Sequence, residues 1–214
     1  MYIGVVGADY SLYLVADADC AAGRDLAALV EAAVDGGVTI VQVRAKGLGR
    51  DAFVELGLSI ARRLAGRGVP LLVNDDLEVA RACGAAGVHL GQEDVPIAEA
   101  RRLLGPGAVI GLSVNTPAEA VRAERDGADY VGAGPAFATS TKRTGLPVLG
   151  PEGIGTIARA TRLPVVAIGG IGPANAARLA EAGARGVAVV SAIMGAPDAR
   201  RAAADLIQAF KRNR

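Results

Sequence analysis

The chain alternates short apolar runs with segments whose apolar residues recur at helical spacing, and this alternation continues from end to end. The apolar runs predict strands at residues 12–16, 38–43, 70–73, 87–90, 109–112, 130–132, 164–168 and 186–190. The segments between and after them predict helices at residues 25–34, 52–65, 96–104, 116–126, 152–161, 174–182 and 198–210, with one more ending near residue 83. Strands that alternate with helices in this way pair in parallel through right-handed crossovers.

Eight strand–helix units close most naturally into a (β/α)₈ TIM barrel, an α/β fold. We expect one domain over residues 1–214, with residues 1–10 as an irregular N-terminal extension. An open, doubly wound sheet is the alternative, but it usually has a glycine-rich fingerprint after the first strand. Here Ala16, Asp17, Ala18 and Asp19 follow that strand, which favours the barrel.

Composition narrows the classes of partner. Hydrophobic residues make up 51% of the chain but aromatic residues only 3%, so Ala, Val, Leu and Ile must build the core. The 23 basic and 22 acidic residues are interspersed, which argues against a nucleic-acid surface or a membrane-binding face. The chain has no signal peptide pattern and no apolar stretch of membrane-spanning length, so we expect a cytoplasmic protein.

Polar residues gather where the predicted strands end. In a barrel these ends meet at one rim, where the active site lies. The residues in question are Gln42, Arg44, Lys46, Asn74, Asp75, Asp94, Ser113, Thr139, Thr141, Lys142, Gly170 and Ser191. Polar groups at seven strand ends indicate a binding site rather than scattered surface residues.

The charges among them suit a diphosphate held with a divalent metal. Arg44, Lys46 and Lys142 are cations, and Asp75 and Asp94 are isolated carboxylates. Mg²⁺ prefers one or two carboxylates together with phosphate oxygens of the substrate, although Mn²⁺ accepts the same oxygen ligands. No nucleophile–base pair is evident, so the site suits a reaction in which diphosphate departs and the enzyme supplies orientation and electrostatics.

A second group of residues suits a phosphate bound by backbone amides and hydroxyls. The loop at residues 134–142 (GPAFATSTK) brings hydroxyls at Thr139, Ser140 and Thr141. Glycines 169–170 and residues 190–192 follow the last two predicted strands, a common phosphate-binding position in barrels.

Purely structural explanations exist for several of these residues. Asp75 or Asp76 could cap the helix that follows them, and Asp94 could cap the helix at residue 96. Arg44 could pair with a surface carboxylate. His89 lies within a predicted strand and is expected to be packed and hydrogen-bonded rather than to act as a metal ligand or base.

Eight motifs in order resemble the thiamine-phosphate synthase family over nearly the whole length. They are YLVAD at residues 13–17, QVRAK at 42–46, NDD at 74–76, HLGQED at 89–94, GLS at 111–113, GPAFATSTK at 134–142, IGGI at 168–171 and VVSAI at 189–193. The resemblance implies a transferase that joins 4-amino-2-methyl-5-(diphosphooxymethyl)pyrimidine to 4-methyl-5-(2-phosphoethyl)thiazole, or to a carboxylated form of it. Diphosphate leaves first, and the thiazole nitrogen then attacks the pyrimidine-methyl cation to give thiamine phosphate.

The resemblance also implies a role for each matching residue. Those implied to bind the pyrimidine diphosphate are Gln42, Val43, Arg44, Ala45, Lys46, Asn74, Ser113 and Lys142, with Arg44, Lys46, Ser113 and Lys142 as catalytic residues. Those implied to bind the thiazole phosphate are Thr139, Ser140, Thr141, Gly170, Val190 and Ser191. Asp75 and Asp94 would be the Mg²⁺ ligands.

Two other functions fit the same fold: a thiazole tautomerase, and a non-catalytic barrel that senses thiazole or thiamine phosphate. Neither needs the diphosphate and metal residues Arg44, Lys46, Asp75, Asp94 and Lys142, and their presence favours the synthase. The expected partners are small phosphorylated substrates. The sequence leaves the oligomeric state open, a homo-oligomer included.

Overall fold

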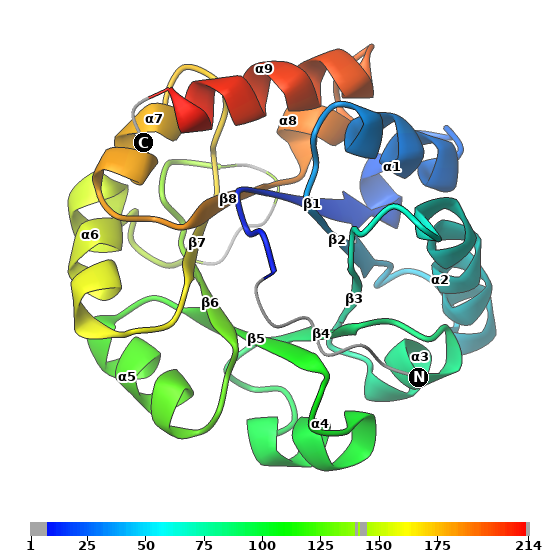
Figure 1. Ribbon diagram of the computed structural model, residues 1–214, viewed down its shortest axis with the longest axis horizontal. Helices are drawn as coiled ribbons and strands as arrows, with labels where there is room; N and C mark the ends of the chain where they lie inside the picture. Colours follow the sequence, from blue (N-terminus) through cyan, green and yellow to red (C-terminus); the bar gives the residue numbers. More distant parts are fainter. Residues whose placement is uncertain (1–7, 140, 142–144, 213–214) are drawn as a thin grey trace.

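The computed structural model describes residues 8–139, 141 and 145–212, and its strands close into a parallel barrel. Each strand pairs with the next along the chain, and β8 closes the ring by pairing with β1, which confirms the predicted (β/α)₈ fold (Figure 1). The strands are β1 (Leu12–Asp17), β2 (Ile40–Arg44), β3 (Leu71–Asn74), β4 (Gly87–Leu90), β5 (Val109–Val114), β6 (Tyr130–Ala133), β7 (Val165–Ile168) and β8 (Gly186–Val189).

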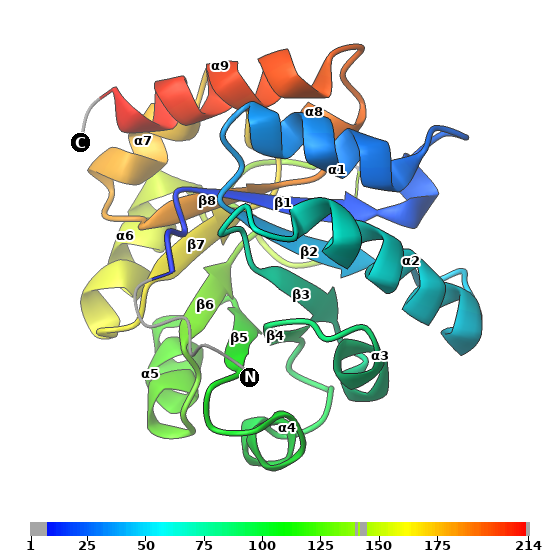
Figure 2. The ribbon, with the colours of Figure 1, turned by 45° about the vertical axis from the view of Figure 1, so that its right-hand side comes forward.

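Helices form the outer layer around this barrel. They are α1 (Leu26–Asp35), α2 (Arg50–Leu64), α3 (Leu77–Ala82), α4 (Ile97–Leu104), α5 (Pro117–Arg125), α6 (Gly150–Ala160), α7 (Ala176–Glu181), α8 (Ser191–Met194) and α9 (Ala199–Lys211). In Figure 2, α9 lies alongside α1 and completes the ring over β8 and β1. Among the described residues, no helix is both long and apolar enough to cross a membrane.

Local capping explains where several helices begin. Asp25 accepts backbone hydrogen bonds at the start of α1, and Asp198 does so at the start of α9. Thr116 and Glu119 form a reciprocal capping box at the start of α5, where Pro117 occupies the first turn. Two short elements were not predicted, α8 and a 3₁₀ turn at Ala18–Cys20, because a single turn is too short to show periodicity.

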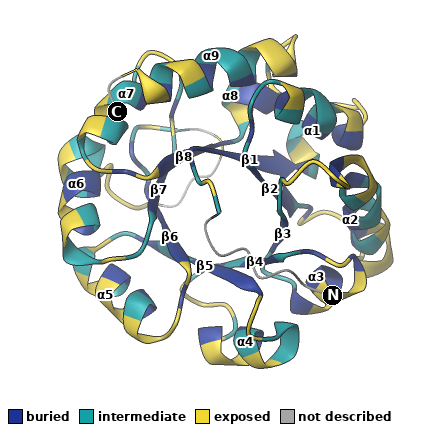
Figure 3. Cartoon of the chain, in the orientation of Figure 1, coloured by how far each residue is buried: buried dark blue, intermediate teal, exposed yellow. Residues whose placement is uncertain are grey.

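The strands are largely buried (Figure 3), and their alternation divides the buried side chains between two cores. Side chains that point outward, such as Leu14 and Val43, pack against the helices. Side chains that point inward, such as Tyr13, Ile40 and Tyr130, fill the barrel itself. Polar side chains that point inward near the carboxyl ends of the strands therefore face the mouth of the barrel.

Candidate active site

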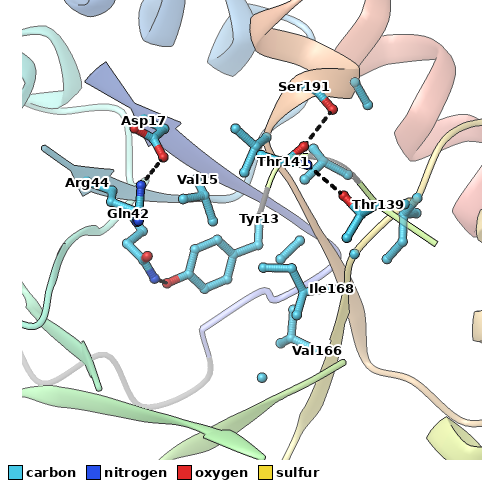
Figure 4. Close-up of a pocket in the computed structure, with 18 of the residues that line it drawn as sticks. Tyr13, Val15, Asp17, Gln42, Arg44, Thr139, Thr141, Val166, Ile168 and Ser191 are labelled. Atoms are coloured by element: carbon cyan, nitrogen blue, oxygen red, sulfur yellow. Dashed lines mark hydrogen bonds and ion pairs between the residues drawn. The ribbon is translucent and has the colours of Figure 1, made fainter. Parts of the chain in front are cut away.

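A cavity of about 530 Å³ opens inside the mouth of the barrel, at the carboxyl ends of the strands. Most of the predicted site residues that the structure describes lie on its wall, as Figure 4 shows for part of them. The predicted residues that line it are Gln42, Arg44, Asn74, Ser113, Thr139, Thr141, Gly170, Val190 and Ser191. Ser140 and Lys142 lie outside the described residues.

Arg44 is held by a carboxylate inside the site. Its guanidinium forms a salt bridge with Asp17, the last residue of β1, and both residues line the cavity (Figure 4). The Asp17 side chain is 6% exposed, so this partner is not the surface carboxylate that the purely structural explanation required. A guanidinium has five N–H donors, so Asp17 can fix its orientation and leave others to face the cavity.

Lys46, Asp75 and Asp94 do not line the cavity but lie together beyond the strand ends, and we call them the carboxylate side of the site. The Lys46 ammonium lies 3.5 Å from Asp75 Oδ2, beyond the ends of β2 and β3. Burial raises the pKa of the Asp75 carboxyl, and the hydrogen bond and charge of Asp94 raise it further, while Lys46 opposes them. A bound cation would favour the ionised form of Asp75, which burial and the neighbouring Asp94 oppose.

The backbone at Asp75 is unusual. Its φ of 63° lies in the left-handed region, which a non-glycine residue rarely occupies outside functional or tightly constrained sites. Its amide nitrogen donates to the His89 carbonyl at 3.0 Å, which ties the end of β3 to β4. The conformation holds the Asp75 carboxylate near Asp94 rather than over the following helix.

Helix capping accounts for Asp76 but not for Asp75 or Asp94. Asp76 accepts hydrogen bonds from the amides of Glu78 and Val79 at 3.0 and 2.9 Å and is the N-cap of α3. Asp94 instead accepts from the Gly91 amide at 2.6 Å, within its own loop. Helix α4 begins at Pro96 without a side-chain cap.

The oxygen ligands of the carboxylate side fit Mg²⁺ or Mn²⁺ better than zinc. Across the described ranges, no three His, Cys, Asp or Glu side chains gather as metal ligands. Structural zinc sites need four protein ligands, whereas Mg²⁺ is held by one or two carboxylates with substrate oxygens and water. Asp75 and Asp94 supply that smaller set.

The amide side of the site is built from the loops after β7 and β8. Gly169 and Gly170 adopt positive φ angles of 103° and 63°. A Cβ at Gly170 would lie 2.4 Å from the Ala138 carbonyl oxygen, so only glycine lets the two loops approach this closely. Asn175 braces the turn, because its amide donates to the Gly170 carbonyl at 3.0 Å and its oxygen accepts from the Gly172 amide at 2.9 Å.

Hydroxyl groups join the amide side to the loop after β6. Thr141 Oγ1 donates to Ser191 Oγ at 3.4 Å, and the Thr141 amide donates to Thr139 Oγ1 at 3.3 Å (Figure 4). Ser191 is the first residue of α8, and Val190 precedes it on the cavity wall. The two loops thus present three hydroxyls to the cavity.

Val43 and Ala45 face away from the cavity. Both are buried in the core between the sheet and the helices. Any contact with a ligand would come from their backbone, and their implied role in binding stays a prediction.

A row of hydrogen-bonded polar side chains crosses the barrel interior and lines the cavity. We call Gln42, Tyr13, Tyr130, His89 and Ser113 the polar row. Gln42 Nε2 lies 2.7 Å from Tyr13 Oη, and the two tyrosine hydroxyls are 2.8 Å apart. Tyr130 Oη lies 2.8 Å from His89 Nδ1, and His89 Nε2 lies 2.9 Å from Ser113 Oγ. The expected hydrogen-bonded role of His89 is confirmed.

Sequence reasoning assigned no role to four polar residues on the cavity wall: Tyr13, Asp17, Tyr130 and Asn175. Tyr13 and Asp17 begin and end the YLVAD motif, which was a usable signal. Tyr130 opens a strand with no motif of its own, and its partners come from β1 and β4. Asn175 lies in a loop, and its hydrogen bonds to the turn at Gly170 and Gly172 are evident only from the structure.

Comparison with known proteins agrees with this geometry. The family model described as thiamine monophosphate synthase matches residues 12–193. A thiamine-phosphate synthase from Syntrophomonas wolfei is 46% identical over 209 residues, covering 98% of this chain and all of that protein. One from Albidiferax ferrireducens is 51% identical over 187 residues, covering 87% of this chain and 85% of that protein.

Solved structures show the same likeness. A thiamine phosphate pyrophosphorylase from Pyrococcus furiosus has a TM-score of 0.86 at 36% identity, covering 96% of this chain and 97% of that one. An orotidine 5'-phosphate decarboxylase from Pyrococcus horikoshii has a TM-score of 0.68 at 18% identity, a likeness that concerns the fold alone.

Proposed function

Because this chain belongs to the thiamine monophosphate synthase family, we propose that it joins a pyrimidine-methyl diphosphate to a thiazole phosphate and releases diphosphate. The substrates are 4-amino-2-methyl-5-(diphosphooxymethyl)pyrimidine and 4-methyl-5-(2-phosphoethyl)thiazole, or the carboxylated form of the latter. The observation that supports the proposal is one cavity with two unlike sides. Arg44 and Asp17 line one side, with Lys46 and Asp75 paired beyond the ends of the neighbouring strands, and neutral hydroxyls and glycines line the other. A diphosphate suits the first side and a monophosphate suits the second.

The pyrimidine diphosphate would lie toward β2–β5. Gln42, Asn74 and Ser113 would bind it with neutral polar groups, while Arg44 and Lys46 would face its phosphate oxygens. Guanidinium and ammonium donors form the stronger, charge-assisted hydrogen bonds with phosphate. Lys142 is proposed to contribute a third cation from outside the described residues.

The thiazole phosphate would lie against the amide side. Thr139, Thr141 and Ser191 bring hydroxyls, and the turn at Gly170 lets backbone amides approach a phosphate closely. Ser140 is assigned here from sequence alone. This placement would set the thiazole nitrogen opposite the methyl carbon that loses diphosphate.

The proposed chemistry asks for charge stabilisation rather than proton transfer. As the carbon–oxygen bond breaks, Arg44 and Lys46 would stabilise the negative charge that develops on the diphosphate. Asp17 would keep the Arg44 guanidinium in place during this change, so little reorganisation is needed.

A magnesium ion would be held by Asp75 and Asp94 and, when bound, would neutralise part of the diphosphate charge. The raised pKa of Asp75, caused by burial and by Asp94, supports this assignment because a cation would favour both carboxylates in their ionised form. The cytoplasmic location and a homo-oligomeric state stay predictions.

The direct test is to incubate the purified protein with both substrates and Mg²⁺ and to follow thiamine phosphate by chromatography. We expect product and diphosphate in equal amounts, and none without the pyrimidine diphosphate. Thiazole isomerisation without condensation would indicate the tautomerase instead. Binding of thiazole phosphate with no turnover of either substrate would indicate the sensor.

A further inference from the structure

The polar row joins two residues proposed to bind the pyrimidine, Gln42 and Ser113, through three that have no assigned role. Tyr13, Tyr130 and His89 come from β1, β6 and β4, so the row crosses the barrel rather than following one strand. All four of its links are between 2.7 and 2.9 Å, which is the distance of well-formed hydrogen bonds.

Proton counting gives the row a direction. Gln42 Nε2 donates to Tyr13 Oη. Either phenol could donate to the other, but donation by Tyr130 would leave the Tyr13 proton without an acceptor in the row, so we assign the Tyr13 proton to Tyr130. The Tyr130 proton is then directed to His89 Nδ1, which must be unprotonated to accept it. His89 therefore bears its proton on Nε2 and donates it to Ser113 Oγ, whose own proton is free to point into the cavity.

We infer that Tyr13, Tyr130 and His89 are positioning residues that fix Ser113 as a hydrogen-bond donor to the pyrimidine substrate. The direction starts at the Gln42 amide and passes through the side chains of Tyr13, Tyr130 and His89 to Ser113. The identity of the group that accepts the Ser113 proton rests on the proposed function. The direction of the hydrogen bonds in the polar row does not depend on the proposed function.

The surroundings show that the row is a built feature of the barrel. A Cβ at Gly111 would lie 2.1 Å from the Tyr130 ring, and a Cβ at Gly132 would lie 2.9 Å from His89 Cε1. These strand glycines leave the space that the two rings occupy. Burial raises the pKa of both Tyr13 and Tyr130, so the two phenols keep the protons that the row requires.

The chain contains a single histidine, which makes the direction measurable. Nuclear magnetic resonance of the full chain, labelled with ¹⁵N in the histidine ring and free of substrate, reports the tautomer of His89 without assignment ambiguity. We expect a neutral ring with its proton on Nε2. A proton on Nδ1, or on both nitrogens, would overturn the inference.

Two variants test how the direction is transmitted. Tyr130→Phe removes the donor to Nδ1, and Gln42→Met removes the first donor of the row three hydrogen bonds away. We expect a mixture of both tautomers in each variant. A single Nε2–H tautomer in either variant would show that the polar row does not set the tautomer of His89. If Tyr130→Phe fails to fold, Gln42→Met provides the test alone.

Tyr10→Phe is the matched control. Its ring lies 5.0 Å from the Tyr130 ring between centroids, yet its hydroxyl is outside the polar row. We expect the wild-type tautomer in this variant. A tautomer mixture here would mean that packing around Tyr130, and not the row, sets the histidine.

Kinetics then connect the row with Ser113. For Tyr130→Phe we expect kcat/KM for the pyrimidine diphosphate to fall about tenfold, the value of one hydrogen bond, with the thiazole phosphate KM unchanged. An equal loss for both substrates would contradict the positioning role. An inactive wild type with the Nε2–H tautomer would count against the proposed function alone, and an active wild type with the other tautomer against this inference alone.

Discussion

The carboxylate side and the amide side of the proposed site offer phosphate groups different kinds of contact. The carboxylate side places Asp75 beside Asp94, with Lys46 at 3.5 Å, and holds Asp75 in a left-handed backbone conformation. The amide side relies on Gly170, which provides a close approach of two loops, and on uncharged hydroxyls. Burial and Asp94 disfavour the charged form of Asp75 on the first side, whereas the second side depends on neutral groups and on the space that Gly170 leaves. Substitutions on the two sides should therefore impair different steps: turnover on the carboxylate side and thiazole phosphate binding on the amide side.

The largest effect is expected from Asp94→Asn. Loss of one carboxylate from the proposed metal site should reduce thiamine phosphate formation on the order of 10³-fold, since the developing diphosphate charge loses its stabilisation. Steady-state assays with varied Mg²⁺ measure this loss. The Kd for thiazole phosphate alone, measured by calorimetry, should stay within about twofold of the wild-type value, because Asp94 makes no proposed contact with it. Loss of even one hydrogen bond to this ligand would change the Kd about tenfold.

Asp76→Asn is the control for that variant. It makes the same change from carboxylate to amide in the neighbouring loop, and asparagine caps a helix about as well as aspartate. Activity close to the wild type is expected. Equal losses in Asp76→Asn and Asp94→Asn would mean that the loops, and not a metal, are sensitive to charge.

On the amide side, Gly170→Ala should raise the KM for thiazole phosphate roughly tenfold to hundredfold. The new Cβ would collide with the Ala138 carbonyl and force a left-handed alanine, a strain of about 1–3 kcal/mol that displaces the loop. Gly172→Ala is the comparison, because a Cβ there meets no atom within 4 Å. An unchanged KM in Gly170→Ala would remove this turn from the phosphate site.

The barrel was predictable from sequence because parallel strands and helices leave separate periodic patterns. Predicted and observed strands coincide at Gly87–Leu90 and differ by one or two residues at the ends of the others. Helix starts at Asp25, Thr116 and Asp198 followed from capping residues that act locally. Elements of a single turn, such as Ser191–Met194, contain too few residues to show a period.

The charged residues of the site were predictable for the same reason, since each follows a strand and all strand ends meet at one rim. The links between them were not. That Arg44 pairs with Asp17, or that His89 lies between Tyr130 and Ser113, depends on which side chains face inward across the barrel. The left-handed backbone of Asp75 likewise has no sequence signal, because glycine or asparagine would be the usual residue there.

The smallest effect concerns the folding cost of the carboxylate side and is measured without metal. Because the pKa of Asp75 is raised in the folded protein, the native state binds more protons than the unfolded state above the ordinary value of 3.8. Stability of the wild type should then fall as the pH rises from that value through the folded pKa of Asp75. Asp75→Asn removes this slope, so in EDTA it should be the more stable protein at pH 8, by at most about 1 kcal/mol for a partly exposed pair, or about 2–4 °C in Tm.

The pH dependence separates charge from backbone in that comparison. Asparagine also tolerates the left-handed conformation of residue 75 better than aspartate, but this gain does not vary with pH. The Tm difference between Asp75→Asn and the wild type should therefore widen from pH 4 to pH 8, and saturating Mg²⁺ should narrow or reverse it by stabilising only the wild type. A Tm difference that stays constant with pH would mean that only the backbone conformation of residue 75 contributes to it. The carboxylate side would then have no measurable charge cost, and the two sides would differ only in geometry.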